Sequence, residues 1–131
     1  MNSTRFTFKK EERLCSKKLI DKIFEGKKVI HLFPFSIYYT CCDMDIAYPA
    51  QVLFAVSKKN FKRAVDRNRI KRLCKEAYRS QKNDYYSMLL KEKLKVAMVV
   101  VYNHKEHLDY NKMANKLQLA IDKLLMNIIK K

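Results

Sequence analysis

One segment restricts the fold of this chain more than any other, because it must form a helix with two very different sides. From Asp66 to Arg79, apolar residues recur at the spacing of one helical face, which predicts an amphipathic helix. The apolar stripe consists of Ile70, Leu73, Cys74, Ala77 and Tyr78. The opposite face carries Asn68, Lys71, Arg72, Lys75 and Arg79. A fold that contains this helix must cover the stripe and leave a densely cationic face open.

The charge around this helix predicts a polyanionic partner. Residues 56–78 contain nine basic and two acidic side chains, a net charge of +7, and the whole chain carries a formal net charge of +16. Like charges four residues apart, such as Arg67 and Lys71, destabilise an isolated helix. Binding to phosphates releases condensed counterions and contributes much of the binding free energy. Nucleic acid is therefore the first candidate, ahead of an anionic membrane surface.

The sequence gives no sign of a membrane protein. Its longest apolar run, VAMVVVY at residues 96–102, is far shorter than the ~18 residues that a membrane span needs. The first ten residues lack the apolar core of a signal peptide. We therefore expect a cytoplasmic protein without a membrane partner.

The chain is expected to form a single RNA-binding domain over residues 1–131, with residues 1–12 as a flexible basic arm. It has one glycine and two prolines and no linker-like stretch, which favours helices and strands joined by short turns. A helix is expected at residues 16–25, with Ser16 as N-cap and Gly26 as the stop. Residues 35–41 and 50–56 have the composition of strands and are expected to pair with each other.

The second half of the chain alternates helix and strand. After the helix at 66–79, we expect a short helix at 84–94, a buried strand at 95–102 and a last helix with Asp109 as N-cap. The inward face of that last helix is expected to hold Met113, Leu117, Ile121, Leu124 and Ile128. The order of these elements predicts an α+β domain with helices packed on a sheet.

No pattern typical of an enzyme active site is present. The sequence has no Gly-rich phosphate loop, GxSxG or HExxH motif, and no carboxylate pair suited to acid–base catalysis. Its four cysteines include no CxxC pair, so we expect free, buried thiols and assign no metal ligand. We predict binding surfaces in place of catalytic residues.

Two such surfaces can be identified. The first is the cationic stretch around residues 58–75, where the Asn68 amide could hydrogen-bond a ribose, a base edge or a water of a hydrated Mg²⁺ ion. The second is aromatic: rings on the strand at 35–41, together with apolar residues of the first helix, could stack unpaired bases. For each of these aromatic residues, a position in the core is an equal alternative. The residues of this second surface are Ile20, Phe24, Phe35, Tyr38 and Tyr39.

The basic segment resembles the protein component of bacterial ribonuclease P. The RNR motif of that family is present as RNRIKRL at residues 67–73, preceded by VSKK at 56–59 and by Ala64-Val65, and followed by Ala77 and Tyr78. The resemblance is looser elsewhere but spans nearly the whole chain. The two aromatic residues on the first helix of the family correspond to Ile20 and Phe24, and the aromatic on its strand to Tyr39. The chain has Val101-Tyr102 where many relatives have Ala-Arg.

The resemblance implies a fold and a division of labour. The fold is a two-layer α/β sandwich on a four-stranded sheet, similar to a ribosomal-protein domain, with a left-handed βαβ crossover. The function is that of an accessory subunit in an endoribonuclease that removes the 5′ leader of precursor tRNA. The RNA subunit performs the chemistry with Mg²⁺ ions that it holds itself, so no catalytic side chain and no small-molecule substrate are expected on this chain.

The resemblance also assigns residues to partners. Residues for the catalytic RNA are Lys58, Lys59, Arg63, Arg67, Asn68, Arg69, Lys71, Arg72 and Lys75, with Asn68 placed near a hydrated Mg²⁺. Residues for a cleft that binds the precursor leader, between the first helix and the sheet, are Ile20, Phe24, Phe35 and Tyr39.

Three other functions compete with this interpretation. The nearest is a generic ribosome- or RNA-associated protein of the same fold, without a role in tRNA processing. A helix-turn-helix DNA-binding protein would need a helix, not strands, before residue 66. A nuclease that acts without RNA would need clustered carboxylates to bind metal ions.

Overall fold

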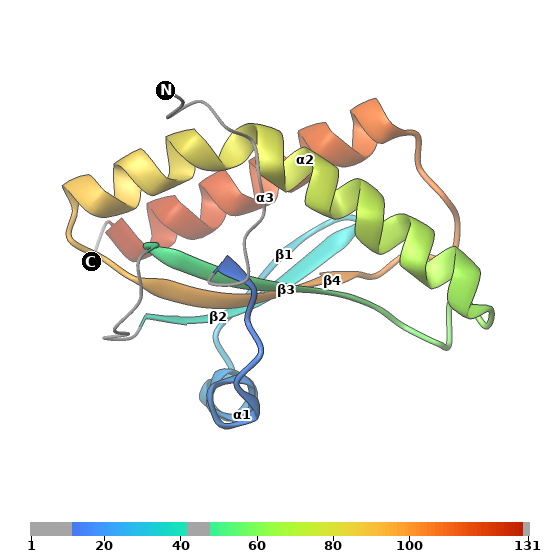
Figure 1. Ribbon diagram of the computed structural model, residues 1–131, viewed down its shortest axis with the longest axis horizontal. Helices are drawn as coiled ribbons and strands as arrows, with labels where there is room; N and C mark the ends of the chain where they lie inside the picture. Colours follow the sequence, from blue (N-terminus) through green and yellow to red (C-terminus); the bar gives the residue numbers. More distant parts are fainter. Residues whose placement is uncertain (1–11, 42–47, 130–131) are drawn as a thin grey trace.

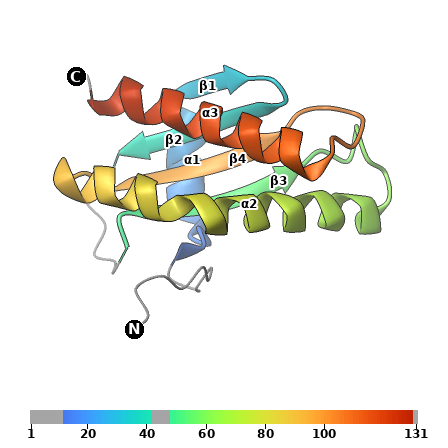
Figure 2. The same ribbon diagram turned by 90° about the horizontal axis from the view of Figure 1, so that it is seen from above.

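The computed structural model describes residues 12–41 and 48–129, which form a four-stranded sheet with helices on both faces (Figure 1). The elements, in chain order, are α1 (Lys17–Gly26), β1 (Val29–Leu32), β2 (Phe35–Cys41), β3 (Ala50–Val56), α2 (Ala64–Lys91), β4 (Val96–Tyr102) and α3 (Tyr110–Ile129). Helices α2 and α3 lie side by side on one face of the sheet, and α1 lies on the other (Figures 1 and 2). The predicted α+β class is confirmed.

Strand β4 occupies the interior of the sheet, whose order is β1-β2-β4-β3. It pairs antiparallel with β2 and parallel with β3. Its alternate residues are buried on both faces: Met98 and Val100 pack under α2 and α3, and Ala97 and Val99 pack under α1. The prediction that residues 35–41 and 50–56 pair with each other is therefore wrong. A strand that is apolar on both faces belongs in the middle of a sheet, and β4 separates the other two.

The connection from β3 through α2 to β4 is a left-handed crossover. In Figure 2 the sheet is seen from the side of α2 and α3, with β3 and β4 running in the same direction. Along that direction, the chain leaves β3, returns through α2 above the sheet and enters β4 on the left of β3. About 98% of such connections are right-handed, so this feature agrees with the expectation from the family and not with the general rule.

Helix α2 is one continuous helix of 28 residues, so the prediction of separate helices at 66–79 and 84–94 is wrong. The buried face continues from Tyr78 through Lys82 to Tyr85, Tyr86 and Leu89. Residues 80–84 are polar in the sequence and resemble a break between helices. The helix persists because Lys82, which falls on the buried face, finds a partner there.

The ends of the helices agree with the sequence at most positions. Ser16 and Asp109 are N-caps: their side-chain oxygens accept hydrogen bonds from the backbone N–H groups of Leu19 (3.2 Å) and Lys112 (2.9 Å). Gly26 is not the predicted stop, because it is the last residue of α1 and the left-handed conformation falls on Lys27 (φ 57°). Strand β1, an edge strand of four residues that forms a hairpin with β2, was not predicted from the sequence.

Candidate nucleic-acid interface

The loop before α2 presents Lys58 and Lys59, both exposed, at the start of the basic segment. The loop is anchored from below by Phe61, a buried residue whose ring packs against those of Tyr102 (centroids 6.3 Å apart) and His107 (5.2 Å). The Ser57 carbonyl accepts hydrogen bonds from the backbone N–H groups of residues 60 and 61. The two lysines therefore project from a turn that is fixed to the core.

Two arginines of the predicted RNA-binding set make contacts within the protein. The Arg67 Nη1 group donates to the carbonyl oxygens of Phe61 (2.8 Å) and Lys62 (2.9 Å), so this side chain joins the loop to the first turns of α2. The Arg63 guanidinium donates to both carboxylate oxygens of Asp66 (3.1 and 3.4 Å). This hydrogen bond lowers the pKa of Asp66. Arg67 in particular has a structural role at the start of the helix.

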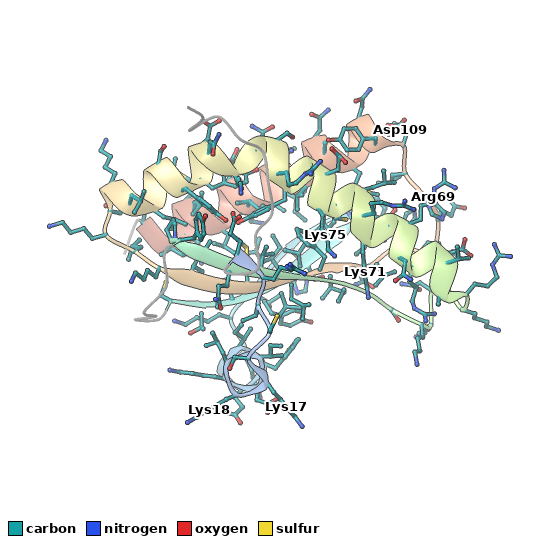
Figure 3. The ribbon with its side chains drawn as sticks, viewed as in Figure 1. Lys17, Lys18, Arg69, Lys71, Lys75 and Asp109 are labelled. Carbon is teal, nitrogen blue, oxygen red and sulfur yellow. The ribbon has the colours of Figure 1, made fainter. Side chains whose placement is uncertain are left out.

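The outer face of α2 is cationic, as predicted. Four residues of the predicted set are exposed there and Lys71 is partly exposed; the exposed ones are Asn68, Arg69, Arg72 and Lys75. Figure 3 labels Arg69, Lys71 and Lys75 along the first half of the helix. The apolar stripe on the other side lies in the core, with Leu73 packed at its edge. Residues of the motif therefore extend from both flanks of one rigid helix.

On one flank, the cations of α2 meet a residue from the beginning of the chain. Arg13 lines a hollow together with Arg72, Lys75, Glu76 and Arg79. The Arg79 Nη2 atom lies 2.6 Å from Glu76 Oε1. The hollow still contains three more basic than acidic side chains, which suits it to the phosphates of a nucleic-acid backbone. Arg13 was not among the site residues predicted from the sequence.

A buried ion pair places Arg13 there. The neighbouring Glu12 is fully buried, and its Oε2 atom lies 2.5 Å from Nζ of Lys82, which is 4% exposed. The Tyr86 hydroxyl donates to the same carboxylate oxygen (2.7 Å). On the other side of Arg13, the Leu14 N–H donates to the carbonyl of Val52 in β3 (3.0 Å). The prediction of a flexible arm at residues 1–12 is wrong at Glu12; residues 1–11 lie outside the described part of the chain.

The second surface is formed by α1 and the face of the sheet beneath it. Phe24 is 44% exposed, and its ring lies 4.9 Å from that of Tyr38, centroid to centroid. Ile20 and Tyr38 are partly buried against the small cluster that joins α1 to β4. These three side chains provide an apolar and aromatic surface that is partly open to solvent.

Two residues of the predicted leader cleft, Phe35 and Tyr39, are misassigned. Both are buried in the core under α2 and α3, on the side of the sheet away from α1. The Tyr39 hydroxyl accepts a hydrogen bond from Asn127 Nδ2 of α3 (2.7 Å). Successive residues of a strand point to opposite faces, so Tyr38 is the aromatic residue of β2 that faces α1. The polar partner of the Tyr39 hydroxyl is thus Asn127, an exposed residue of α3, on the face of the sheet away from α1.

The described residues contain no group of three or more His, Cys, Asp or Glu side chains that could hold a metal ion. Cys15 and Cys41 are exposed, contrary to the expected burial, whereas Cys74 is free and buried. Within residues 12–41 and 48–129, no helix has both the length and the apolar character needed to cross a bilayer.

Comparison with known proteins gives consistent matches. The model of the family described as Ribonuclease P matches residues 8–125. A ribonuclease P protein component from Porphyromonas gingivalis is 28% identical over 123 residues, covering 94% of this chain and 90% of the relative. One from Chlorobium phaeobacteroides is 41% identical over 85 residues, covering 63% of this chain and 58% of the relative.

Solved structures agree on the fold. The RNase P protein of Staphylococcus aureus superposes with a TM-score of 0.67 at 20% identity, covering 86% of this chain and 94% of the other. The RNase P protein of Thermotoga maritima has a TM-score of 0.64 at 23% identity, covering 83% and 94%.

Proposed function

This chain belongs to the ribonuclease P protein family, and from that premise we propose that it acts as the protein subunit of the endoribonuclease that matures the 5′ ends of tRNA. In this role it binds the catalytic RNA and the single-stranded leader of precursor tRNA, and so promotes removal of the leader. The observation that carries this proposal is the RNR motif itself. Its Asn68 and Arg69 are exposed on α2, and its Arg67 holds the loop that presents two further lysines.

The catalytic RNA would lie along the outer face of α2. Lys58, Lys59, Arg69, Arg72 and Lys75 are exposed and carry no ion pair among the described residues. Arginine can contact a phosphate through two parallel hydrogen bonds, whereas lysine acts as a point charge. A rigid helix that holds such groups in fixed positions loses little entropy on binding, which favours affinity.

The other four residues predicted to contact the catalytic RNA differ from these five exposed cations. Arg63 and Arg67 already make contacts within the protein, Asn68 is uncharged and Lys71 is only partly exposed. Arg67 holds the loop in place, so we assign it a positioning role in addition to any phosphate contact. Asn68 is exposed and uncharged, and we propose that it hydrogen-bonds the RNA backbone or a water of a hydrated Mg²⁺ ion held by the RNA.

The leader of the precursor would lie against α1 and the sheet. We assign Ile20, Phe24 and Tyr38 to this contact, with Tyr38 in place of the two buried strand residues. Stacking of a base on an aromatic side chain contributes about 1–3 kcal/mol. A partly exposed ring pair supports such stacking without reading the base, which suits leaders of varied sequence.

The chemistry of cleavage would be supplied by the RNA subunit and its Mg²⁺ ions. On this chain, the described residues offer cationic and aromatic contacts but no cluster of metal ligands. We propose the cytoplasm as the place of action, because precursor tRNA is made there, with no membrane partner and no small-molecule substrate.

The test is cleavage of precursor tRNA at low Mg²⁺ concentration by the purified chain, the cognate catalytic RNA, and both together. Strong stimulation of the RNA by the chain is the expected result. Tight RNA binding without stimulation would leave only a generic RNA-binding protein. Cleavage by the chain alone, freed of RNA, would overturn the assignment of the chemistry to the RNA.

A further inference from the structure

A second hollow lies on the other flank of α2, between the RNR motif and the start of α3. It has a volume of about 540 Å³ and is lined by Arg69, Leu73, His107, Leu108, Asp109 and Tyr110. Figure 3 shows the labelled Arg69 and Asp109 at the same end of the molecule, one on α2 and the other at the beginning of α3. The hollow therefore adjoins the surface proposed for the catalytic RNA, and Arg69 belongs to both.

The walls of this hollow are held in place from inside the protein. The Tyr102 hydroxyl, at the end of β4, donates to the Glu106 carbonyl (2.6 Å) and accepts from the Leu108 N–H (3.3 Å). The His107 ring packs edge-on against Phe61 of the loop before α2. Asp109 is fixed by its capping bond to the Lys112 N–H. The segment from residue 106 to 110 is thus fastened at three points.

The lining combines apolar and aromatic side chains, a cation and a carboxylate, which is more than a phosphate site requires. Leu73 and Leu108 are apolar and partly buried, and Tyr110 presents a ring that is 36% exposed. Arg69 supplies a planar cation. Asp109 supplies a carboxylate with one oxygen engaged in capping and the other able to accept a further hydrogen bond.

These groups match an unpaired nucleobase better than any part of the RNA backbone. A phosphate would be repelled by Asp109 and would gain nothing from the leucines. A base can stack on the tyrosine ring and on the guanidinium plane, and its exocyclic amine can donate to the carboxylate. Adenine, cytosine and guanine carry such an amine. Uracil does not, and its N3–H lies between two carbonyls that the carboxylate repels.

We propose that this hollow holds one unpaired, amino-bearing nucleobase of the RNA that binds along α2. The inference rests on the proposed function. It adds one contact that recognises a base to the contacts proposed for phosphates on α2. Stacking of the base on Tyr110 is the main contribution, and Arg69 joins the base site to the phosphate surface.

The test compares Tyr110→Ala with Tyr110→Phe in RNA binding. In Tyr110→Ala, loss of one stacking contact should raise the dissociation constant about 5- to 150-fold. In Tyr110→Phe, the phenyl ring should restore most of the affinity. The slope of log K against log salt should not change, because stacking releases no counterions. A matched control is Leu119→Ala, which removes another exposed apolar side chain of α3, about 13 Å further along the helix.

Binding is measured separately for the catalytic RNA and for precursor tRNA, so the RNA that loses affinity identifies the source of the base. Equal affinities of Tyr110→Ala and Leu119→Ala for both RNAs would overturn the inference. Failure of the wild-type chain to bind or stimulate the catalytic RNA would instead overturn the proposed function. A photoreactive benzoylphenylalanine in place of Tyr110 should crosslink to one unpaired nucleotide; crosslinks confined to paired nucleotides would also refute the base site.

Discussion

Replacement of Lys82 by methionine should destabilise the protein strongly, although it removes one of 29 basic residues from a chain with excess positive charge. The Lys82 ammonium is buried against the Glu12 carboxylate, which is fully buried. Methionine fills a similar volume and is a good helix former. The variant therefore removes the ammonium group, with its contacts to Glu12 and to the Tyr86 ring (5.7 Å), and largely keeps the packing volume.

The magnitude follows from the two responses open to the variant. If residues 12–14 stay in place, a buried carboxylate loses its cation and keeps the hydrogen bond from Tyr86; breaking a buried pair in this way costs about 3–5 kcal/mol. If the segment detaches to hydrate the carboxylate, Leu14 (2% exposed) becomes exposed. That exposure costs about 1.5–3 kcal/mol, and the bond to Val52 adds about 1 kcal/mol. Either response therefore lowers the free energy of unfolding by roughly 2.5–5 kcal/mol.

The assay is urea unfolding followed by circular dichroism, without RNA. Lys75→Met on the same helix is the control: Lys75 is exposed among other cations, so its loss should change stability by less than about 0.5 kcal/mol. The double variant Glu12→Gln/Lys82→Met removes both charges and should recover most of the lost stability, because a neutral pair of similar volume replaces the buried ions. The reasoning is refuted if Lys82→Met and Lys75→Met have the same urea midpoint. It is also refuted if the double variant is less stable than Lys82→Met.

Three further predictions concern binding and pH. Tyr38→Ala should weaken binding of precursor tRNA about 5-fold or more and leave binding of mature tRNA unchanged. Tyr39→Phe should lower the free energy of unfolding by about 1 kcal/mol without changing binding of the leader. The opposite pattern in binding assays would return the leader contact to Tyr39. Arg72→Ala should reduce the salt slope of RNA binding by about one unit, and an unchanged slope would remove Arg72 from the interface. Burial raises the pKa of Cys74 from 9.0 to about 12 and also raises the pKa of Tyr78. Above about pH 9 the unfolded chain loses protons that the folded protein retains, so the urea midpoint should fall as the pH rises from 9 to 11; a constant midpoint would contradict this.

Local patterns in the sequence were sufficient for much of the fold. The stripe from Ile70 to Tyr78 and the apolar run of β4 lie in the core as expected, and the caps at Ser16 and Asp109 are present. These features depend on side-chain spacing over a few residues, which the sequence displays directly. The RNR motif likewise reaches the surface because the stripe decides which side of the helix is buried.

Long-range pairing could not be read in the same way. The alternation of β2 shows that Tyr38 and Tyr39 face opposite ways, but not which face α1 covers. The central position of β4 depends on a crossover whose handedness opposes the usual preference. The continuity of α2 depends on Lys82, whose charge suggests exposure and whose partner lies 70 residues earlier in the chain. Arg13 was missed as a site residue because long-range contacts of its neighbours, from Glu12 to Lys82 and from Leu14 to Val52, bring it to α2.

The ion pair also sets where the cationic surface ends. Asn68, Lys75 and Lys82 are spaced by seven residues, close to two helical turns, so they lie nearly in line along α2. The first two are exposed and the third is buried. The difference comes from Glu12, whose buried carboxylate pairs with the Lys82 ammonium and makes this cation part of the core. Past Lys82, the buried face of α2 continues through Tyr85, Tyr86 and Leu89. Along this line of α2, the exposed cations proposed to contact RNA therefore end where Glu12 pairs with Lys82, and Arg13 lines the same hollow as Lys75.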